Sequence, residues 1–223
     1  AARDDFSPEI LELAGSRFSG MDEADKMSLQ NNVVAGLPGA NDNWDIAQVR
    51  ELLNTYAGIS ADDLRANLVD FLSAVAPLAD ELGLRLCCHP DDPPFSLLGL
   101  PRIMSSESDY ARILNAVDLP SSGVTFCTGS LGVAEDFDAP GFIKRLGSRI
   151  HFVHLRNTTR LAPSDGQKTS FYEAAHLEGD TDMVATIRAL LAEEDRRRTE
   201  GRGDWRIPMR PDHGQDILTD LQT

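Results

Sequence analysis

From residue 84 onward, short apolar runs alternate with longer amphipathic segments, and this alternation limits the fold more than any other feature. Four runs have the composition of β-strands: LRLCC (84–88), GVTFC (123–127), RIHFVHL (149–155) and WRIPM (205–209). Helices are predicted between and after them, at 107–117, 139–147, 181–198 and from 214 onward. Strands joined by helical crossovers run parallel, so the sequence predicts an α/β fold with about four strand–helix units.

Residues 1–83 contain no such strands and predict a helical segment. Helices are expected at 9–18, 22–36, 44–58 and 60–83. The first has a typical start, because Ser7 can cap it and Pro8 occupies the first helical position. Apolar residues at helical spacing predict one buried face on the last helix: Leu64, Leu68, Phe71, Leu72, Val75, Leu78 and Leu82. Pro77 should kink that helix.

The charge and cysteine content exclude several classes of function. With 21 Lys and Arg against 36 Asp and Glu, the net charge is −15. Such a chain lacks the basic surface that nucleic acids and anionic membranes require, so neither is an expected partner. Three cysteines do not form a disulfide framework, and we expect a reduced, cytoplasmic protein. No apolar stretch approaches the length of a membrane span.

Side chains that bind metals follow the predicted strands. His89 follows the first, Cys127 ends the second, His154 lies near the end of the third, and Asp212 follows the fourth. The carboxyl ends of parallel strands in a barrel form one rim, so we expect these residues to converge. Imidazole, thiolate and carboxylate together suit a divalent transition metal. Taken singly, each residue could instead have a structural role. The cysteine could simply pack in the core, and each histidine could be hydrogen-bonded within a loop.

Neighbouring residues are assigned to the core. Strand alternation places His151 and His154 on opposite faces, and His151 is expected to pack or to act as a cap. Cys87 and Cys88 also face opposite ways and are both expected to be buried.

Five motifs in order, CCHPDDPP, FCTGSLG, HFVHLRN, AHLEGD and RPDHG, resemble the mannonate dehydratase family. The resemblance covers nearly the whole chain, including NNVVAGLPGA upstream. It implies a cytoplasmic (β/α)8 TIM-barrel enzyme of hexuronate degradation. This enzyme would convert D-mannonate to 2-dehydro-3-deoxy-D-gluconate and water with Mn²⁺ or Fe²⁺. The family's metal ligands would fall on His89, Cys127, His154 and Asp212, and its catalytic histidine on His213.

The chain starts at AARDD and stops within a predicted helix, so we expect it to be part of a longer protein. The resemblance implies barrel strands ahead of Ala1 and a proton-transferring tyrosine after RPDHG. Within the parent domain, residues 1–83 would be a helical segment that comprises an insertion and a barrel helix. Residues 84–223 would be the C-terminal strand–helix units of a partial barrel and would carry the metal site.

Four residues are candidates for substrate binding. Arg156 and Arg210 lie beside proposed ligands, and either guanidinium could bind the substrate carboxylate. Their alternative is an ion pair with Asp91 or Asp92. Asn157 could donate to sugar hydroxyls, and His176 is a second-tier candidate. His213 could be the proton carrier, because a backbone turn at Gly214 would allow it and Asp212 to reach the same site. The alternative is a residue at the start of a helix whose side chain is hydrogen-bonded to the backbone.

Two other functions stay open at this point. A metal-dependent TIM-barrel sugar isomerase, similar to xylose isomerase, would use like ligands without loss of water. The second alternative is a truncated, non-catalytic fragment that binds a metal and a partner. Zn²⁺ competes with Mn²⁺ and Fe²⁺ because one proposed ligand is a thiolate. Homo-oligomerisation is left open.

Overall fold

The computed structural model describes residues 2–35, 45–162 and 167–214. The chain divides into two units: Ala1–Ser60 with Ser96–Pro101 and Asp165–Gln167, and a larger unit that contains the rest. The division at Ser60 and the segment boundary expected at residue 83 differ by one helix, which belongs to the larger unit.

The smaller unit is helical, as predicted. It contains the 3-10 helix Ala2–Asp5 and the α-helices α1 (Pro8–Gly20), α2 (Glu23–Ala35) and α3 (Ile46–Asn54). The predicted start of α1 is confirmed, because the Ser7 hydroxyl accepts from the backbone N–H of Ile10 at 3.4 Å. Helix α3 starts with a capping box between Asp45 and Gln48. The expected end of α2 at residue 36 lies outside the described residues.

Helix α4 (Ala61–Glu81) continues through Pro77, and the left-handed Gly83 follows it. Its predicted buried face is partly wrong. Leu72 and Ala76 are buried in the core, whereas Phe71, Leu78 and Leu82 are exposed. The apolar residues of α4 therefore form two stripes, of which the described part of the chain covers one.

A four-stranded parallel sheet forms the centre of the larger unit. Its strands are β1 (Leu86–Cys88), β2 (Ser122–Cys127), β3 (Ile150–His154) and β6 (Met209–Arg210). They lie side by side in the order β1-β2-β3-β6. The fourth strand was predicted at 205–209 but begins only at Met209. Because spatial order follows chain order, the sheet is wound in one direction, with no reversal of the kind found in doubly wound folds.

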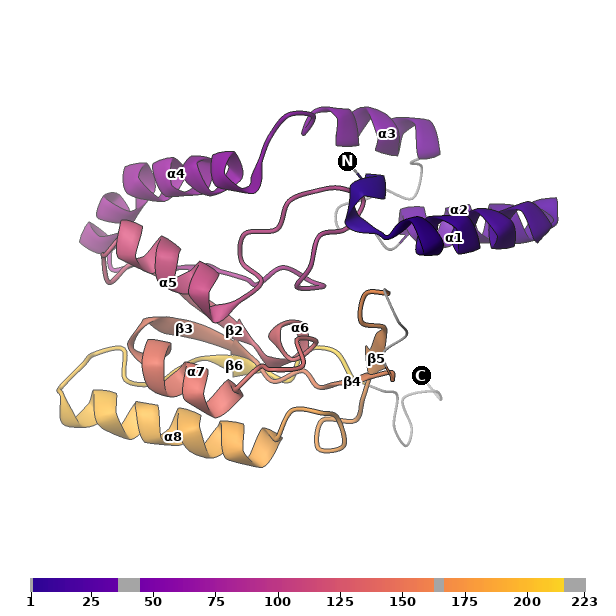
Figure 1. Cartoon of the computed structure of the whole chain (residues 1–223). Coiled ribbons are helices and arrows are strands. Elements are labelled where there is room, and N and C mark those ends of the chain that lie inside the picture. Colours follow the sequence, from indigo (N-terminus) through magenta and orange to yellow (C-terminus); the bar gives the residue numbers. More distant parts are fainter. Residues whose placement is uncertain (1, 36–44, 163–166, 215–223) are drawn as a thin grey trace, which may run out of the picture. The chain divides into compact units, whose positions relative to one another are not determined.

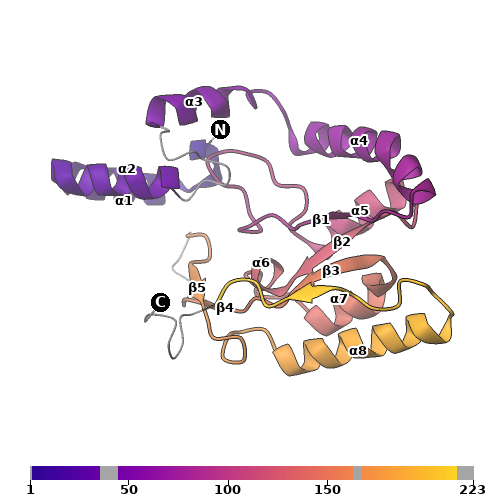
Figure 2. The ribbon, with the colours of Figure 1, turned by 180° about the vertical axis from the view of Figure 1, so that it is seen from behind.

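Helices α5 (Glu107–Ala116), α7 (Ala139–Leu146) and α8 (Met183–Thr199) connect these strands. Residues from all three share one hydrophobic core with Val124 and Phe126 of β2. Helix α7 lies in front of the strands in Figure 1 and behind them in Figure 2, on one side of the sheet. Since side chains alternate along a strand, Thr125 and Cys127 face the other side.

Three features of the connections were not predicted. A short helix, α6 (Thr128–Leu131), follows β2 directly, and the 3-10 helix Gly147–Arg149 precedes β3. An antiparallel hairpin of β4 (Thr158–Arg160) and β5 (Phe171–Glu173) follows β3. Asp182 caps α8, whereas Asp180, which lies just before the helix predicted at 181–198, does not. Instead, Asp180 accepts a hydrogen bond from the Arg160 backbone N–H at 2.7 Å.

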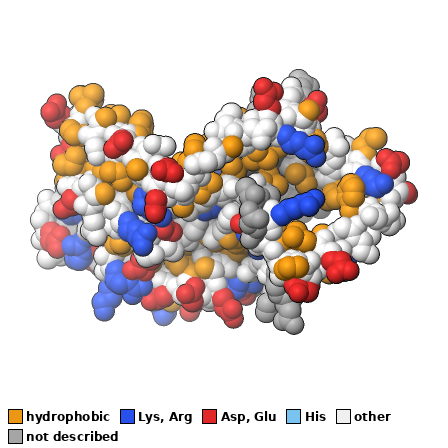
Figure 3. Space-filling view, turned by 45° about the horizontal axis from the view of Figure 1, so that its top comes forward, with side chains coloured by type: hydrophobic (Ala, Val, Ile, Leu, Met, Phe, Trp, Pro, Cys, Tyr) orange, Lys and Arg blue, Asp and Glu red, His pale blue; other side chains and the backbone are white. Residues whose placement is uncertain are grey.

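Basic and acidic side chains are interspersed on the surface shown in Figure 3. Among the described residues, no helix is both long and apolar enough to cross a membrane.

Candidate active site

Three of the predicted ligands meet at the carboxyl ends of β1, β2 and β3. One ligand atom from each of His89, Cys127 and His154 lies within 4.8 Å of the other two. The sheet register explains the meeting, because Cys127 and His154 are paired at the ends of neighbouring strands. His89 follows directly after Cys88, the last residue of β1. Parallel strands thus place the three side chains on one face, at one edge.

Cys127 is fully buried, and its surroundings favour the thiolate. Its Sγ accepts from the Ser130 hydroxyl at 3.2 Å and from the Ser130 backbone N–H at 3.5 Å. Burial raises the pKa of the thiol, but hydrogen bonds from His89 and Ser130 outweigh burial and hold the pKa below its ordinary value. A metal-binding cysteine must be deprotonated, so this environment suits a ligand. Sequence reasoning did not find the role of Ser130.

The two imidazoles point ring nitrogens at each other. The His89 Nε2 lies 3.3 Å from the His154 Nδ1. The other nitrogen of His89, Nδ1, lies 2.7 Å from the carbonyl oxygen of Pro90. When His89 is neutral, an Nδ1–H that donates to this carbonyl leaves Nε2 with a lone pair for a ligand, as is usual for metal-binding histidines. The hydrogen bond that His89 donates to Cys127 belongs to the protonated imidazole, and it raises the pKa of His89. Burial lowers the pKa of His154, although Asp212 opposes this effect.

Asp212 brings a carboxylate to the same place. Its Oδ2 lies 3.3 Å from the His154 Nδ1, and only 7% of its side chain is exposed. Its backbone is left-handed, with φ of 63°, a conformation that aspartate tolerates better than most residues. The turn expected after β6 therefore lies at Asp212 itself. Gly214, to which the turn was attributed, instead lies against the ring of His176.

This donor set fits a divalent transition metal. Bonds of about 2.0–2.3 Å to nitrogen, oxygen and sulfur place the ligand atoms of one ion within about 4.6 Å of each other. The observed spread of up to 4.8 Å is close to that limit. His89, Cys127 and His154 could hold Mn²⁺, Fe²⁺ or Zn²⁺. Asp212 lies next to His154 but is not part of this group of three, so the structure brings together three of the four predicted ligands.

The predicted proton carrier, His213, lies next to a carboxylate that sequence reasoning missed. The His213 Nδ1 is 3.6 Å from Oε1 of Glu173, and 62% of the His213 side chain is exposed. Glu173 is the last residue of β5. The run SFYE has the aromatic content of a strand, which could have revealed the hairpin. Nothing in the sequence identifies the partners of Glu173.

Arg156, one of the two candidates for the substrate carboxylate, is paired with two carboxylates of the protein. Its Nε donates to both carboxylate oxygens of Glu173, at 2.9 and 3.0 Å, and its Nη1 donates to Asp92. The residue is buried, with 5% exposed. Burial alone would lower the pKa of Arg156, but Glu173 and Asp92 raise it, so the guanidinium stays charged. The alternative ion pair with Asp92 is correct, while Asp91 pairs with Arg102.

Asn157, the candidate for contact with sugar hydroxyls, also has all of its polar side-chain atoms in hydrogen bonds with the protein. It is completely buried. Its amide donates to the carbonyls of His176 and Thr181, at 2.9 and 3.1 Å. Its Oδ1 accepts from the backbone N–H groups of Thr158 and Thr181. With every polar atom paired, Asn157 joins the hairpin to the loop that precedes α8.

The remaining candidates lie near Asp212. Arg210 has 55% of its side chain exposed and donates from Nη2 to Oδ1 of Asp212. It is thus the more accessible of the two predicted arginines. The His176 Nε2 lies 3.0 Å from the carbonyl oxygen of Pro211. His176 thereby supports the loop that carries Asp212 and His213.

Of the residues assigned to the core, His151 is confirmed as buried, whereas Cys87 and Cys88 are only half-buried. His151 is buried, with its Nε2 2.9 Å from the Pro120 carbonyl oxygen. Burial lowers the pKa of His151 to about 4. Cys88 packs against the core, and Cys87 is half-buried.

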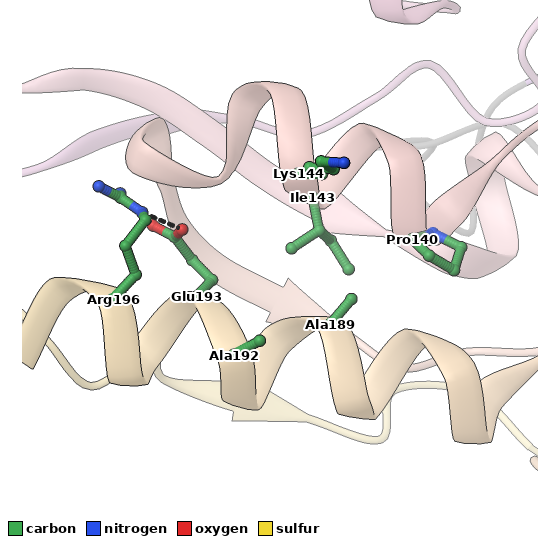
Figure 4. A pocket seen from close by; sticks show the side chains of 7 residues that line it. All are labelled: Pro140, Ile143, Lys144, Ala189, Ala192, Glu193 and Arg196. Carbon is green, nitrogen blue, oxygen red and sulfur yellow. Dashed lines mark hydrogen bonds and ion pairs between the residues drawn. The ribbon is translucent and has the colours of Figure 1, made fainter.

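Two hollows in the larger unit lie apart from these residues. One, of about 450 Å³, lies between α7 and α8, with Ile143 and Ala189 in its lining (Figure 4). Glu193 and Arg196 form an ion pair at its edge. The other, of about 400 Å³, is lined by Arg85, Arg149 and Arg202 near the beginnings of the strands. Neither lining contains a predicted ligand, so the candidate site rests on the strand ends alone.

A family model described as D-mannonate dehydratase (UxuA) matches residues 12–223. The chain belongs to this family. The match includes every predicted ligand as well as His213, and it extends through the smaller helical unit from α1 onward.

Individual proteins similar to this chain are also mannonate dehydratases. The chain is 53% identical over 221 residues to a mannonate dehydratase of Rhizobium meliloti, covering 99% of this chain and 54% of the relative. It is 54% identical over 220 residues to mannonate dehydratase 1 of Agrobacterium fabrum, with the same coverage. The crystal structure of mannonate dehydratase from Streptococcus suis serotype 2 matches with a TM-score of 0.63 and 34% identity, covering 82% of this chain and 50% of that one. The chain spans about half the length of the curated relatives it matches.

Proposed function

We propose that the protein containing this chain dehydrates D-mannonate to 2-dehydro-3-deoxy-D-gluconate. Membership of the D-mannonate dehydratase family, together with the meeting of His89, Cys127 and His154 within 4.8 Å, supports the proposal. We further propose that the four parallel strands are part of a (β/α)8 barrel in the whole protein. Their sequential order and the helices on one side of the sheet support this part.

The proposed cofactor is Mn²⁺ or Fe²⁺, bound by His89, Cys127, His154 and Asp212. When bound, the ion supplies Lewis-acid stabilisation of the negative charge that develops beside the substrate carboxylate. Four protein ligands leave room for substrate only if the ion takes five or six ligands, which favours Mn²⁺ or Fe²⁺ over tetrahedral Zn²⁺. Cys127 contributes the thiolate that its hydrogen bonds already favour.

The side chains of this chain account for proton transfer and for charge at the site. Dehydration removes the C2 proton and expels the C3 hydroxyl as water, so one group must accept a proton and another must donate one. His213 is the proposed proton carrier, because imidazole changes charge near neutral pH. With Nδ1 next to Glu173, its Nε2 is the atom that would exchange the proton. Arg210 is the proposed partner of the substrate carboxylate, since Arg156 is already paired on both sides.

The test is turnover of D-mannonate by the polypeptide that contains this chain, loaded with Mn²⁺ or Fe²⁺. A thiobarbituric acid assay detects the 3-deoxy-2-keto product directly. His213→Asn should keep the bound metal, measured by elemental analysis, and lose turnover. Undiminished turnover in this variant would exclude His213 as the proton carrier.

Two outcomes would replace the proposal. Interconversion of an aldose and a ketose without any 3-deoxy product would indicate the sugar isomerase alternative. Metal uptake without turnover of either substrate class would indicate a non-catalytic metal site.

A further inference from the structure

The β4–β5 hairpin brings Glu173 to the end of β3. Thr158 of β4 pairs with Glu173 of β5, and β4 begins shortly after His154. The backbone N–H of the next residue, Ala174, donates to the carbonyl of Asn157 at 3.0 Å. Because Asn157 is buried and fully hydrogen-bonded, the backbone that carries Glu173 is fixed beside the metal ligands.

The Glu173 carboxylate lies between a buried cation and the proposed proton carrier. On one side, Arg156 donates to it from both Nε and Nη2. On the other side, its Oε1 lies 3.6 Å from the His213 Nδ1. The Arg156 side chain is only 6% exposed, and its remaining interaction is with Asp92. Arg156 therefore holds the carboxylate in place, while Glu173 is the member of this group that reaches His213.

The charges in this group favour an interaction with imidazole. Asp92 and Glu173 both contact the Arg156 guanidinium, and Glu173 also presents a carboxylate oxygen to the His213 Nδ1. A carboxylate next to Nδ1 selects the tautomer that carries its proton there and limits rotation of the ring. The His213 side chain is 62% exposed, so a contact with Glu173 can restrict a ring that packing leaves largely open to solvent.

We propose that Glu173 is a positioning residue, which orients His213 and keeps its proton on Nδ1 so that Nε2 faces the reaction. The kinetic consequence depends on the proposed function, in which His213 carries a proton. The effect on the His213 ring does not depend on it.

The kinetic test compares Glu173→Gln with Asp92→Asn. Both variants remove one negative charge from Arg156, but only Glu173 contacts His213. Residues that orient the ligands of a metal site typically contribute about 10- to 100-fold to affinity or activity, and we expect the same range for a residue that orients the proton carrier. We expect kcat of Glu173→Gln to fall by that factor with KM little changed, and Asp92→Asn to lose much less. Metal content should be the same in both.

A double variant separates positioning from a general structural effect. If Glu173 acts through His213, then Glu173→Gln combined with His213→Asn should be no slower than His213→Asn alone. Additive losses, or equal losses in Glu173→Gln and Asp92→Asn, would overturn the proposal.

A spectroscopic test does not require turnover. Nitrogen NMR of ¹⁵N-histidine-labelled protein without paramagnetic metal reports the ring tautomer, and the spectrum of His213→Asn assigns the His213 signals. We expect Glu173→Gln to shift His213 away from the Nδ1–H form and Asp92→Asn to leave it unchanged. An unchanged tautomer in Glu173→Gln would refute the positioning role. A wild-type protein that shows the tautomer but does not dehydrate D-mannonate would refute the proposed function alone.

Discussion

Replacing Arg197 with methionine should strongly destabilise the larger unit, because this buried side chain connects α8 to the beginning of β3. Its Nε donates to Glu193 at 2.8 Å, its Nη1 to the Asp204 carbonyl at 3.2 Å and its Nη2 to the Ile150 carbonyl at 2.7 Å. The Nη2 group also donates to the Gly147 carbonyl. The Arg197 side chain is 1% exposed, so water cannot replace these bonds.

The size of the effect follows from what is left unpaired. Removing one partner of a buried ion pair costs about 3–5 kcal/mol. Here Arg196 still donates to both carboxylate oxygens of Glu193, each at 2.7 Å, so that carboxylate keeps a partner. The three carbonyls lose their charged donor, however, and a methionine offers none. We therefore expect the lower end of the range, about 3 kcal/mol.

Thermal unfolding followed by far-UV circular dichroism measures this effect. For a chain of this size, 1 kcal/mol corresponds to about 2–4 °C, so the midpoint should fall by about 6–12 °C. The matched control is Arg188→Met, which makes the same chemical change at an exposed position of the same helix. Its midpoint should change by no more than about 2 °C.

A lysine variant tests the geometry of the interaction. Arg197→Lys keeps the charge but lacks the planar fork that reaches four acceptors at once, so it should recover only part of the loss. Equal midpoints for Arg197→Met and Arg188→Met would refute the reasoning, because they would mean that the buried guanidinium adds nothing to the connection.

Three further predictions concern the sheet. Cys127→Ser should lower Mn²⁺ affinity by about 10-fold or more in calorimetric titration, whereas Cys87→Ser should keep it; equal losses would contradict the ligand assignment. Because the pKa of His151 is lowered to about 4, the unfolded chain gains a proton between pH 6.5 and 4 that the folded chain does not. Stability should therefore fall by about 3 kcal/mol across that range, and His151→Gln should flatten this slope in urea unfolding; an unchanged slope would assign it to other groups. Gly123→Ala should cost about 2 kcal/mol or more, because its Cβ would lie 2.1 Å from the His151 ring and 2.5 Å from a backbone oxygen. Gly203→Ala, with no atom within 4 Å, is the control for the midpoint shift.

Local signals were sufficient for most of the secondary structure. Ser7 caps α1 as predicted, and Ser106 caps α5, because capping depends on residues three apart in sequence. The strand ending at Cys127 was recognised from its apolar run. The strand at Met209 was misplaced, since residues 205–207 have strand-like composition but the hydrogen bonds to β3 begin only at the Pro208 carbonyl.

The faces of α4 could not be read from its periodicity. An apolar stripe predicts that a helix buries one side, but the partner decides which side is covered. Leu72 meets the core, whereas Phe71 and Leu78 do not meet a partner within the described residues.

By itself, the sequence determined the alternation of strands and helices, and with it the meeting of His89, Cys127 and His154. Parallel strands end at one edge whatever else the chain does, so residues at strand ends must come together. Only the tertiary structure decided which charges pair. Arg156 could have met a substrate, Asp91 or Asp92, and the hairpin settled the matter by placing Glu173 against it. Which charges pair depends on distances between residues far apart in the chain. Because a buried charge without a partner costs several kcal/mol, these distances decide which ion pairs form.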